Sequence, residues 1–280
     1  MNATVRGRSR QNIPPRFIGA RWRGERHQRA SQPCCDALWL DGSAERHSGF
    51  VICDGAGGTP AVAHQALRGS RAAWRALLSV YREMERQLRR PGVSPICLEA
   101  LQRRFQAVFF QALDPSGSSR SRSSARGAND SRPRCDHTVL ACLWSSRRLL
   151  VAQVGDSSLL VRCQGVWQLP IAPHKGECAN ETTFLRPSTA PSTIALWWAS
   201  AAAVDAVIGF TDGLEAAFLS PCPEAPERLL PNAALAELLH REHRLRCGWR
   251  GYAAWLQTSL ADPALAALSD DDRTLVIAAR

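Results

Sequence analysis

Two aspartate–glycine turns follow apolar runs in this 280-residue chain. Asp54 follows the run at 50–53, Asp212 follows the run at 206–211, and a glycine comes next in both places. Each carboxylate would lie at a sheet edge, and Gly55 would let its backbone carbonyl turn toward the same point. Carboxylate and carbonyl oxygens are the ligands that hard divalent cations prefer. Either turn alone can also be read as an aspartate that caps the following helix.

Three more acidic positions stand beside expected strands. Asp36 precedes the first strand, Asp156 lies between two others, and the run 270–272 precedes the last. Several carboxylates gathered without bases repel one another unless cations neutralise them. The five positions together therefore predict a shared metal centre, on which they converge from across the chain.

Other kinds of site lack their sequence signatures. The ten cysteines include no CxxC pair, so neither a zinc ribbon nor a thioredoxin-type site is expected. The chain has no nucleotide-binding GxGxxG or GxxxxGK motif, and Ser157 and Ser158 do not stand in a nucleophile elbow. No run of eighteen apolar residues is present, so no membrane partner is expected.

Hydrophobic periodicity indicates the elements that must position these acids. Strands are expected at 37–40, 49–53, 138–144, 148–154, 158–163, 203–210 and 273–279, and helices at 61–88, 96–113, 229–240 and 252–260. Strands and helices are grouped rather than alternating along the chain. This order predicts an α+β fold with antiparallel sheets and helices packed outside them.

The formal charge of +10 is concentrated in two segments. Residues 1–29 carry +7 and residues 114–134 carry +3, so the rest of the chain is neutral. Residues 1–16 read as a flexible basic arm, and 114–134 as a disordered Ser/Arg-rich insertion. This distribution does not favour nucleic-acid binding as the main function. The arginine-rich start has no apolar secretory core, which predicts a cytoplasmic protein with reduced cysteines.

Taken together, the motifs resemble those of the PP2C-type (PPM) metal-dependent serine/threonine protein phosphatases, specifically their compact bacterial branch. That family has an early Asp, then DGxGG, GDS and SDGL turns, and a final acidic pair before a strand. In the same order this chain has Asp36, DGAGG at 54–58, GDS at 155–157, TDGL at 211–214 and DDRTLV at 271–276. The match spans roughly residues 19–279.

The resemblance implies a PP2C-like αββα sandwich, in which helices flank two antiparallel sheets across residues 17–280. It also implies two Mg²⁺ or Mn²⁺ ions, with a third at a weaker outer site. Two such metals activate a bridging water for in-line attack on a phosphate.

Carried over to this chain, the resemblance assigns metal contacts to Asp36, Asp54, Gly55, Asp156, Asp212 and Asp271. Asp54 would bridge the two metals, Asp36 would act through water, and Asp54 and Asp212 would be the central catalytic residues. The last ligand is open among Asp270, Asp271 and Asp272. Asp271 is preferred, because Thr274 then keeps the family's spacing to the strand. Arg29 is the preferred phosphate-binding residue, with Arg26 and Arg23 as the alternatives.

The expected function is metal-dependent hydrolysis of phosphoserine and phosphothreonine in bacterial signalling. The expected partner is a phosphorylated protein, either a Ser/Thr kinase or its target. The alternative is a catalytically weak PP2C-like regulatory or binding module. Two departures from the family motivate it, because Cys35 replaces the usual Glu or Gln and Ser158 replaces the Arg of GDSR.

Overall fold

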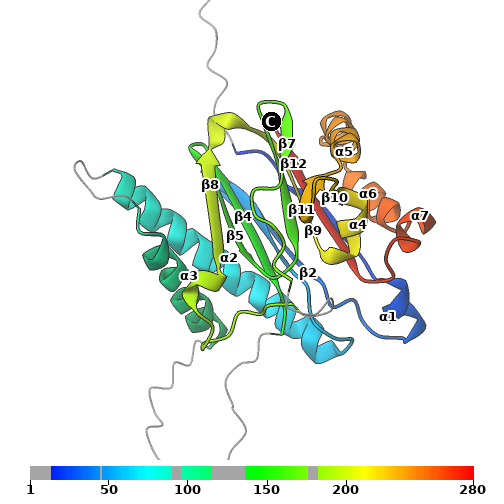
Figure 1. Ribbon diagram of the computed structural model, residues 1–280, viewed down its shortest axis with the longest axis horizontal. Coiled ribbons are helices and arrows are strands. Elements are labelled where there is room, and N and C mark those ends of the chain that lie inside the picture. The colour runs from blue at the N-terminus through cyan, green and yellow to red at the C-terminus, as the bar shows by residue number, and fades with distance from the viewer. Residues whose placement is uncertain (1–13, 45, 90–95, 115–135, 176–181) are drawn as a thin grey trace, which may run out of the picture.

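The computed structural model describes residues 14–44, 46–89, 96–114, 136–175 and 182–280. Two five-stranded antiparallel sheets lie face to face, and helices cover the outer face of each sheet (Figure 1). The four layers form an αββα sandwich, so the expected fold class is confirmed.

The first sheet has the strand order β2–β3–β4–β5–β8. Its strands are β2 (Ala37–Ala44), β3 (His47–Cys53), β4 (Val139–Ser145), β5 (Arg148–Val154) and β8 (Ala195–Ser200). Side chains alternate along β3: Phe50 and Ile52 pack against the second sheet, whereas Val51 and Cys53 pack against helices. Because both faces are covered, the strand is apolar throughout rather than alternately polar.

The second sheet has the strand order β1–β12–β9–β6–β7. Its strands are β1 (Ile18–Trp22), β12 (Arg273–Ala279), β9 (Val204–Phe210), β6 (Ser158–Cys163) and β7 (Val166–Gln168). The last strand of the chain, β12, therefore lies between the first strand and β9. Its register pairs Ile277 with Ile18 and Leu275 with Phe210. This pairing brings the N-terminal and C-terminal segments of the domain to one sheet edge.

Two long helices cover the first sheet, namely α2 (Pro60–Leu88) and α3 (Leu98–Leu113). Thr59 caps α2 by accepting the Val62 N–H at 3.3 Å, and proline follows at the first helical position. Buried residues recur at helical spacing along α2, including Ala66, Ala73, Leu77, Val80 and Met84. This apolar stripe holds the helix against β3 and β4.

Smaller elements cover the second sheet on its outer side (Figure 1). They are α4 (Glu215–Phe218), the hairpin of β10 (Leu219–Cys222) and β11 (Ala225–Pro231), α5 (Ala233–Arg246), α6 (Tyr252–Leu260) and α7 (Pro263–Ala266). A further short helix, α1 (Glu25–Arg29), follows β1, and single 3₁₀ turns lie at Pro191–Thr193, Ala201–Ala203 and Asp212–Leu214.

One helix boundary expected from the sequence is wrong. The periodicity placed a helix over 229–240, but residues up to Pro231 form β11 and the helix α5 begins at Ala233. Asn232 sets this start, because its side chain accepts the Leu235 N–H at 3.2 Å as an N-cap. The apolar residues at 229–230 instead belong to the hairpin of β10 and β11.

The expected flexible segments fall mostly outside the described residues. Of the insertion at 114–134, only Asp114 is described, and of the arm at 1–16, only Pro14 to Arg16. There Pro14 and Pro15 are buried, and the Pro15 carbonyl accepts the Ser48 hydroxyl at 2.6 Å. In the part of the chain that the structure describes, no helix combines the length and apolar character needed to cross a membrane.

Candidate active site

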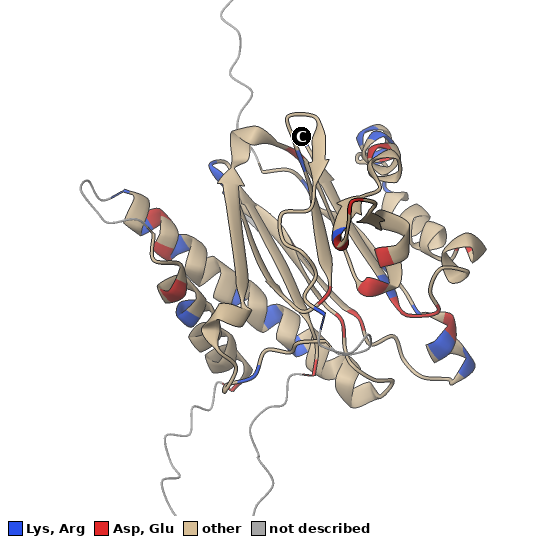
Figure 2. Ribbon diagram, viewed as in Figure 1, with Lys and Arg blue, Asp and Glu red and all other residues tan. Residues whose placement is uncertain are grey.

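Acidic residues from several strand ends meet at one edge of the two sheets (Figure 2). Asp54 directly follows β3, Asp156 lies in the turn between β5 and β6, and Asp212 follows β9. These three carboxylates and Asp271 line one open cavity of about 600 Å³. Residues more than two hundred positions apart therefore share a single site.

The carboxylates of Asp54, Asp156 and Asp212 converge closely. Each offers one oxygen, and the three oxygens lie within 4.8 Å of one another. Asp156 Oδ2 accepts the Thr182 hydroxyl at 2.5 Å, but Asp156 Oδ1 and Asp212 Oδ1 are buried without a hydrogen-bond partner among the described residues. Unpartnered buried oxygens are costly. Such an arrangement suits a bound divalent cation, which would satisfy both oxygens at once.

The pKa values of the cluster support the same conclusion. Burial raises the pKa of Asp54 well above its usual range, and the charges of Asp36 and Asp212 raise it further. Burial also raises the pKa of Asp212 to about 6, against the lowering effect of a hydrogen bond with Asp54. Without a cation, the two carboxyl groups therefore ionise together less readily than exposed aspartates do. A cation that replaces those protons would relieve both the burial cost and the repulsion.

Asp36 lies behind the cavity rather than on its surface. Its Oδ2 accepts the hydroxyls of Thr211 at 2.9 Å and Thr274 at 2.7 Å, and its Oδ1 has no hydrogen-bond partner among the described residues. Burial raises the pKa of Asp36 to about 8; the Thr274 hydrogen bond lowers it, and the nearby charge of Asp272 raises it. Asp36 is thus a buried acid that touches the strands carrying Asp212 and Asp271.

Three consecutive acids before β12 have three different surroundings. Asp271 lines the cavity, whereas Asp270 is exposed and pairs with Arg29 at 2.6 Å. Asp272 is buried, and it accepts the backbone N–H groups of Gly24 at 2.8 Å and Cys35 at 2.6 Å. Of the three candidates for the last ligand, the structure brings Asp271 into the cavity and uses Asp272 to hold the N-terminal segment.

In the turn after Asp54, the backbone runs very close to neighbouring segments of the chain. Asp54 and Thr138 are joined twice, because the Asp54 N–H donates to Thr138 Oγ1 at 3.0 Å and the Thr138 N–H donates to the Asp54 carbonyl at 2.8 Å. A Cβ at Gly55 would lie 2.7 Å from Val62 Cγ1 and 2.8 Å from the Cys35 carbonyl. Gly57 has a φ of +116°. Only glycine fits this path, which sets the Gly55 backbone on the cavity wall.

The arginines are placed differently from the sequence expectation. Arg29 does not line the cavity and is paired with Asp270. Arg26 does line it, and its Nη2 contacts both carboxylate oxygens of Asp271, at 2.8 and 2.9 Å. Arg186 lines it as well, 3.8 Å from Asp136. Sequence reasoning gave no role to Arg186, Thr138 or Thr182, because their place at the cavity depends on contacts between distant segments.

Known proteins resemble this chain in sequence and in fold. Residues 23–261 match the family model described as protein phosphatase 2C. Serine/threonine-protein phosphatase 3 of Escherichia coli (strain K12) is 29% identical over 150 residues, which cover 50% of this chain and 54% of that protein. The match thus spans about half the length of this curated relative.

Two solved structures share the architecture. The serine/threonine phosphatase Stp1 of Staphylococcus aureus superposes with a TM-score of 0.54 and 15% identity, and the match covers 99% of each chain. A C. elegans sex-determining protein has a TM-score of 0.59 and 15% identity, and the match covers 95% of this chain and 65% of that one. At this level of identity, the likeness shows the fold.

Proposed function

The chain belongs to the protein phosphatase 2C family, and on this premise we propose that it is a metal-dependent phosphatase of phosphoserine and phosphothreonine in proteins. The observation that carries the proposal is the convergence of Asp54, Asp156 and Asp212 within 4.8 Å at the floor of an open cavity. Three carboxylates in such a place make a poor binding surface for a phosphate unless cations are present.

The donor set suits Mg²⁺ or Mn²⁺. Asp54, Asp212, Asp271 and the Gly55 carbonyl would hold two ions, Asp156 would contribute to an outer site, and Asp36 would act from behind through water. All of these are hard oxygen donors, and no sulfur or imidazole ligand lines the cavity among the described residues. When bound, the ions would lower the pKa of a water and withdraw charge from the phosphate.

Two arginines at the cavity could bind the phosphate. Arg26 is the better placed of the N-terminal candidates, because it lines the cavity while Arg29 points its charge to Asp270. Asp271 orients the Arg26 guanidinium. Arg186 reaches the same cavity from the segment after residue 182 and is 62% exposed, so it can meet the substrate from the solvent side. Guanidinium groups bind phosphate through paired N–H donors.

The substrate proposed here is a phosphorylated protein, either a Ser/Thr kinase or its target, in the cytoplasm. The cavity is open rather than enclosed by the described residues, which suits a phosphorylated side chain that projects from a protein surface.

Hydrolysis of a phosphothreonine peptide in the presence of Mn²⁺ tests the proposal. Turnover should appear with Mn²⁺ and disappear with excess EDTA. A parallel assay with Asp54→Asn separates this activity from that of a contaminating phosphatase. Metal-independent turnover that survives Asp54→Asn would show that the cavity is not the catalytic site.

A second candidate is a catalytically weak module that binds phosphorylated segments. The observation that favours it is the surroundings of Cys35, whose buried thiol faces the carbonyls of Pro33 at 3.7 Å and Thr59 at 3.9 Å. With cysteine at position 35, the metal centre lacks the acidic side chain that the family often has there. Phosphopeptide binding without turnover at any Mn²⁺ concentration would favour this module over the enzyme.

A further inference from the structure

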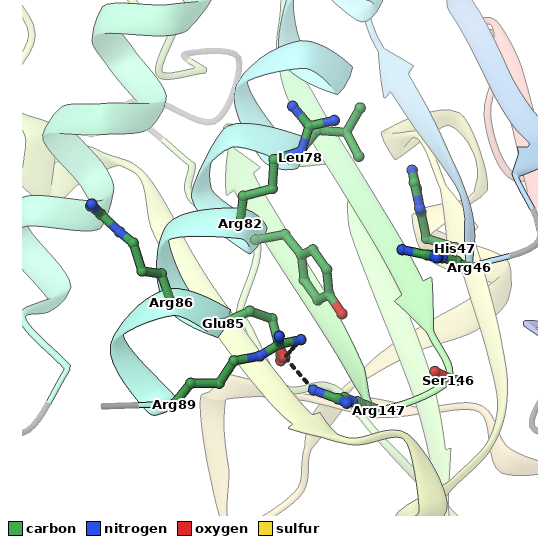
Figure 3. Close-up of a pocket in the computed structure, with 10 residues that line it drawn as sticks. Arg46, His47, Leu78, Arg82, Glu85, Arg86, Arg89, Ser146 and Arg147 are labelled. Carbon is green, nitrogen blue, oxygen red and sulfur yellow. Dashed lines mark hydrogen bonds and ion pairs between the residues drawn. The ribbon is translucent and has the colours of Figure 1, made fainter. Parts of the chain in front are cut away.

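Figure 3 shows a second charged cavity. Its lining residues lie at the opposite end of β3 and β4 from the acidic cluster. The cavity has a volume of about 740 Å³ and lies between the second half of α2 and the turns β2–β3 and β4–β5. His47 lines this cavity and begins β3, whereas Asp54 follows the end of the same strand. Seven residues of extended chain span roughly 23 Å. The two cavities are therefore separate sites.

One carboxylate organises the arginines of this cavity. Glu85, on α2, is mostly buried, and its oxygens lie 3.0 Å from Arg148 Nε, 3.3 Å from Arg147 Nη1 and 3.8 Å from Arg89 Nη2. Figure 3 shows Arg89 and Arg147 pointing toward Glu85 from opposite walls. Glu85 accepts hydrogen bonds from Arg147 and Arg148, and Arg89 lies beside it at ion-pair distance. This shared acid orients the guanidinium groups of one wall of the cavity.

The positive charge exceeds what Glu85 can neutralise. Five arginines and one glutamate line the cavity. Arg86 pairs with Glu83 and points away from Glu85, so it is not counted further. Arg46 and Arg82 have no carboxylate partner among the described residues. Arg46, Arg82, Arg89 and Arg147 thus stand against Glu85 in the lining and Asp41 close to His47, which leaves a positive excess around the cavity.

His47 also lines this cavity, and its surroundings decide whether it adds positive charge there. His47 stacks on Trp74 with ring centroids 6.2 Å apart. Burial lowers its pKa, the charge of Asp41 raises it, and the charge of Arg82 lowers it. A neutral imidazole beside Arg46 can donate or accept one hydrogen bond and leaves the cationic character of the cavity unchanged.

We propose that this arginine cavity binds a compact anion that carries several linked phosphate groups. The guanidinium groups come from three separate elements, namely α2 and the two turns, and they surround the hollow instead of lying along a line. An anion with two or three phosphates contacts several of them at once, whereas an extended acidic peptide would reach fewer. The volume is in the usual range for a small-molecule pocket, and guanidinium forks match phosphate oxygens.

The test is calorimetric titration of the full chain with inorganic tripolyphosphate in excess EDTA, which keeps the acidic cluster free of metal. At about 0.15 M salt, weak long-range attraction is largely screened. We expect one tripolyphosphate per chain. The double variant Arg46→Gln with Arg82→Gln should bind roughly tenfold more weakly or worse, since each lost charge-assisted hydrogen bond is costly. Neither arginine is paired with a described acid, so the fold should survive, and the thermal midpoint checks this.

The matched control is Arg75→Gln with Arg103→Gln. It removes the same charge from exposed positions of α2 and α3 that do not line the cavity. The control should bind as the wild type does. Equal weakening in both double variants would overturn the proposal, because general charge attraction would then explain the binding.

Two further titrations distinguish the kind of anion. Sulfate should bind far more weakly than tripolyphosphate, and equal affinity for both would contradict a site for linked phosphates. An acidic phosphopeptide that binds more tightly than tripolyphosphate, and is lost in the Arg46→Gln and Arg82→Gln variant, would also overturn the proposal. The occupant would then be a protein partner.

Discussion

Adjacent acidic residues in this protein differ in their burial and in their contacts, and therefore in their roles. Asp270, Asp271 and Asp272 are adjacent, yet the first is exposed, the second faces a cavity and the third is buried between backbone N–H groups. The same holds for the two arginines of α1, because Arg26 faces the cavity and Arg29 faces solvent. Chemistry at this site is decided by which neighbours a side chain meets, and single substitutions can test each case.

Asp54→Asn should abolish Mn²⁺-dependent phosphatase activity while leaving the protein folded. The amide keeps the size but removes a charge from the centre of the cluster. Activity should fall about a hundredfold or more, since even changes to the partners of metal ligands cost 10–100-fold. Burial already makes the ionised Asp54 unfavourable in the metal-free state, so the thermal midpoint in EDTA should not fall.

Asp270→Asn is the control for that variant. Asp270 is exposed and lies outside the cavity, so its loss should leave turnover unchanged. If Asp270→Asn were as inactive as Asp54→Asn, the last ligand would lie one position earlier than proposed.

Arg26→Gln and Arg29→Gln form a second matched pair on one helix turn. Removing a charge-assisted donor to the phosphate should lower kcat/KM for a phosphopeptide roughly tenfold to a hundredfold in Arg26→Gln. Arg29→Gln should stay within about twofold, as expected for an exposed surface ion pair. Steady-state kinetics on one peptide decide between them. A larger loss in Arg29→Gln would return the phosphate-binding role to the residue that the motif spacing favours.

At the level of elements, the site depends on how α1 meets the loop before β12. The Arg26 N–H donates to the Asp270 carbonyl at 3.0 Å, and Asp272 accepts the Gly24 N–H. Arg273 is fully buried and donates to the carbonyls of Leu260 at 2.9 Å and Ser269 at 2.7 Å. These bonds hold α1 and the end of α6 against β12. They set the position of both Arg26 and Asp271.

Gly24→Ala should disturb this junction. A Cβ at Gly24 would lie 2.2 Å from the carbonyl carbon of Asp271 and 2.3 Å from its oxygen, and backbone atoms cannot move aside cheaply. We expect a loss of about 1–3 kcal/mol in the free energy of unfolding, as for other overpacked sites, together with reduced activity. Urea unfolding and the phosphopeptide assay measure both effects.

Gly42→Ala is the matched control, because nothing lies within 4 Å of a Cβ at that exposed position. Its stability and activity should equal those of the wild type. A Gly24→Ala protein with wild-type stability would mean that α1 is not packed against the loop as described.

Over the whole molecule, three apolar layers hold the sandwich together while the acids gather at one edge. One cluster joins α2 and α3 to the first sheet, one lies between the sheets, and one joins the second sheet to α4, α5 and α6. This extensive burial can support a locally unfavourable set of carboxylates. The metal-free molecule therefore carries an electrostatic cost at its edge that depends on pH.

The metal-free protein should lose stability as the pH rises from about 4 to about 8. Folding raises the pKa of Asp212 to about 6 and of Asp36 to about 8, above the unfolded value of about 3.9. The folded state thus binds more protons in this range, so the free energy of unfolding falls as pH rises. The stabilising contribution is complete below about pH 4, and it is lost as the pH rises through 6 and then 8.

Thermal unfolding in EDTA at several pH values measures this slope. Asp54→Asn should show a shallower slope, because it removes one of the coupled acids. Mn²⁺ at about a hundred times its dissociation constant should add about 2.7 kcal/mol. A fixed Mn²⁺ concentration should stabilise the protein more at pH 8 than at pH 5, because fewer protons must leave the cluster. Metal-free stability that increases from pH 5 to pH 8 would contradict the buried acidic cluster.

Much of this architecture could be predicted from local patterns. Apolar runs and periodicity correctly indicated α2, β4, β5, β6, β9 and β12, because burial on both faces leaves a continuous apolar strand and a helix leaves a 3.6-residue stripe. The edge strands β1, β7 and β8 were missed, since short or half-exposed strands leave a weaker pattern. Asn232 was the one local signal that could have corrected the start of α5.

The candidate site was also predictable in part from local sequence, and the rest of it depended on the tertiary structure. The turns at Asp54, Asp156 and Asp212 were predicted as metal ligands from sequence, because an acid followed or preceded by glycine at a strand end is a local feature. The choice among Asp270, Asp271 and Asp272, and between Arg26 and Arg29, belonged to the tertiary structure alone. It depends on β12 lying between β1 and β9, which brings the two ends of the domain together. Contacts between segments nearly 250 residues apart leave no trace in local spacing, so only the folded chain decides which of several adjacent charges faces the cavity.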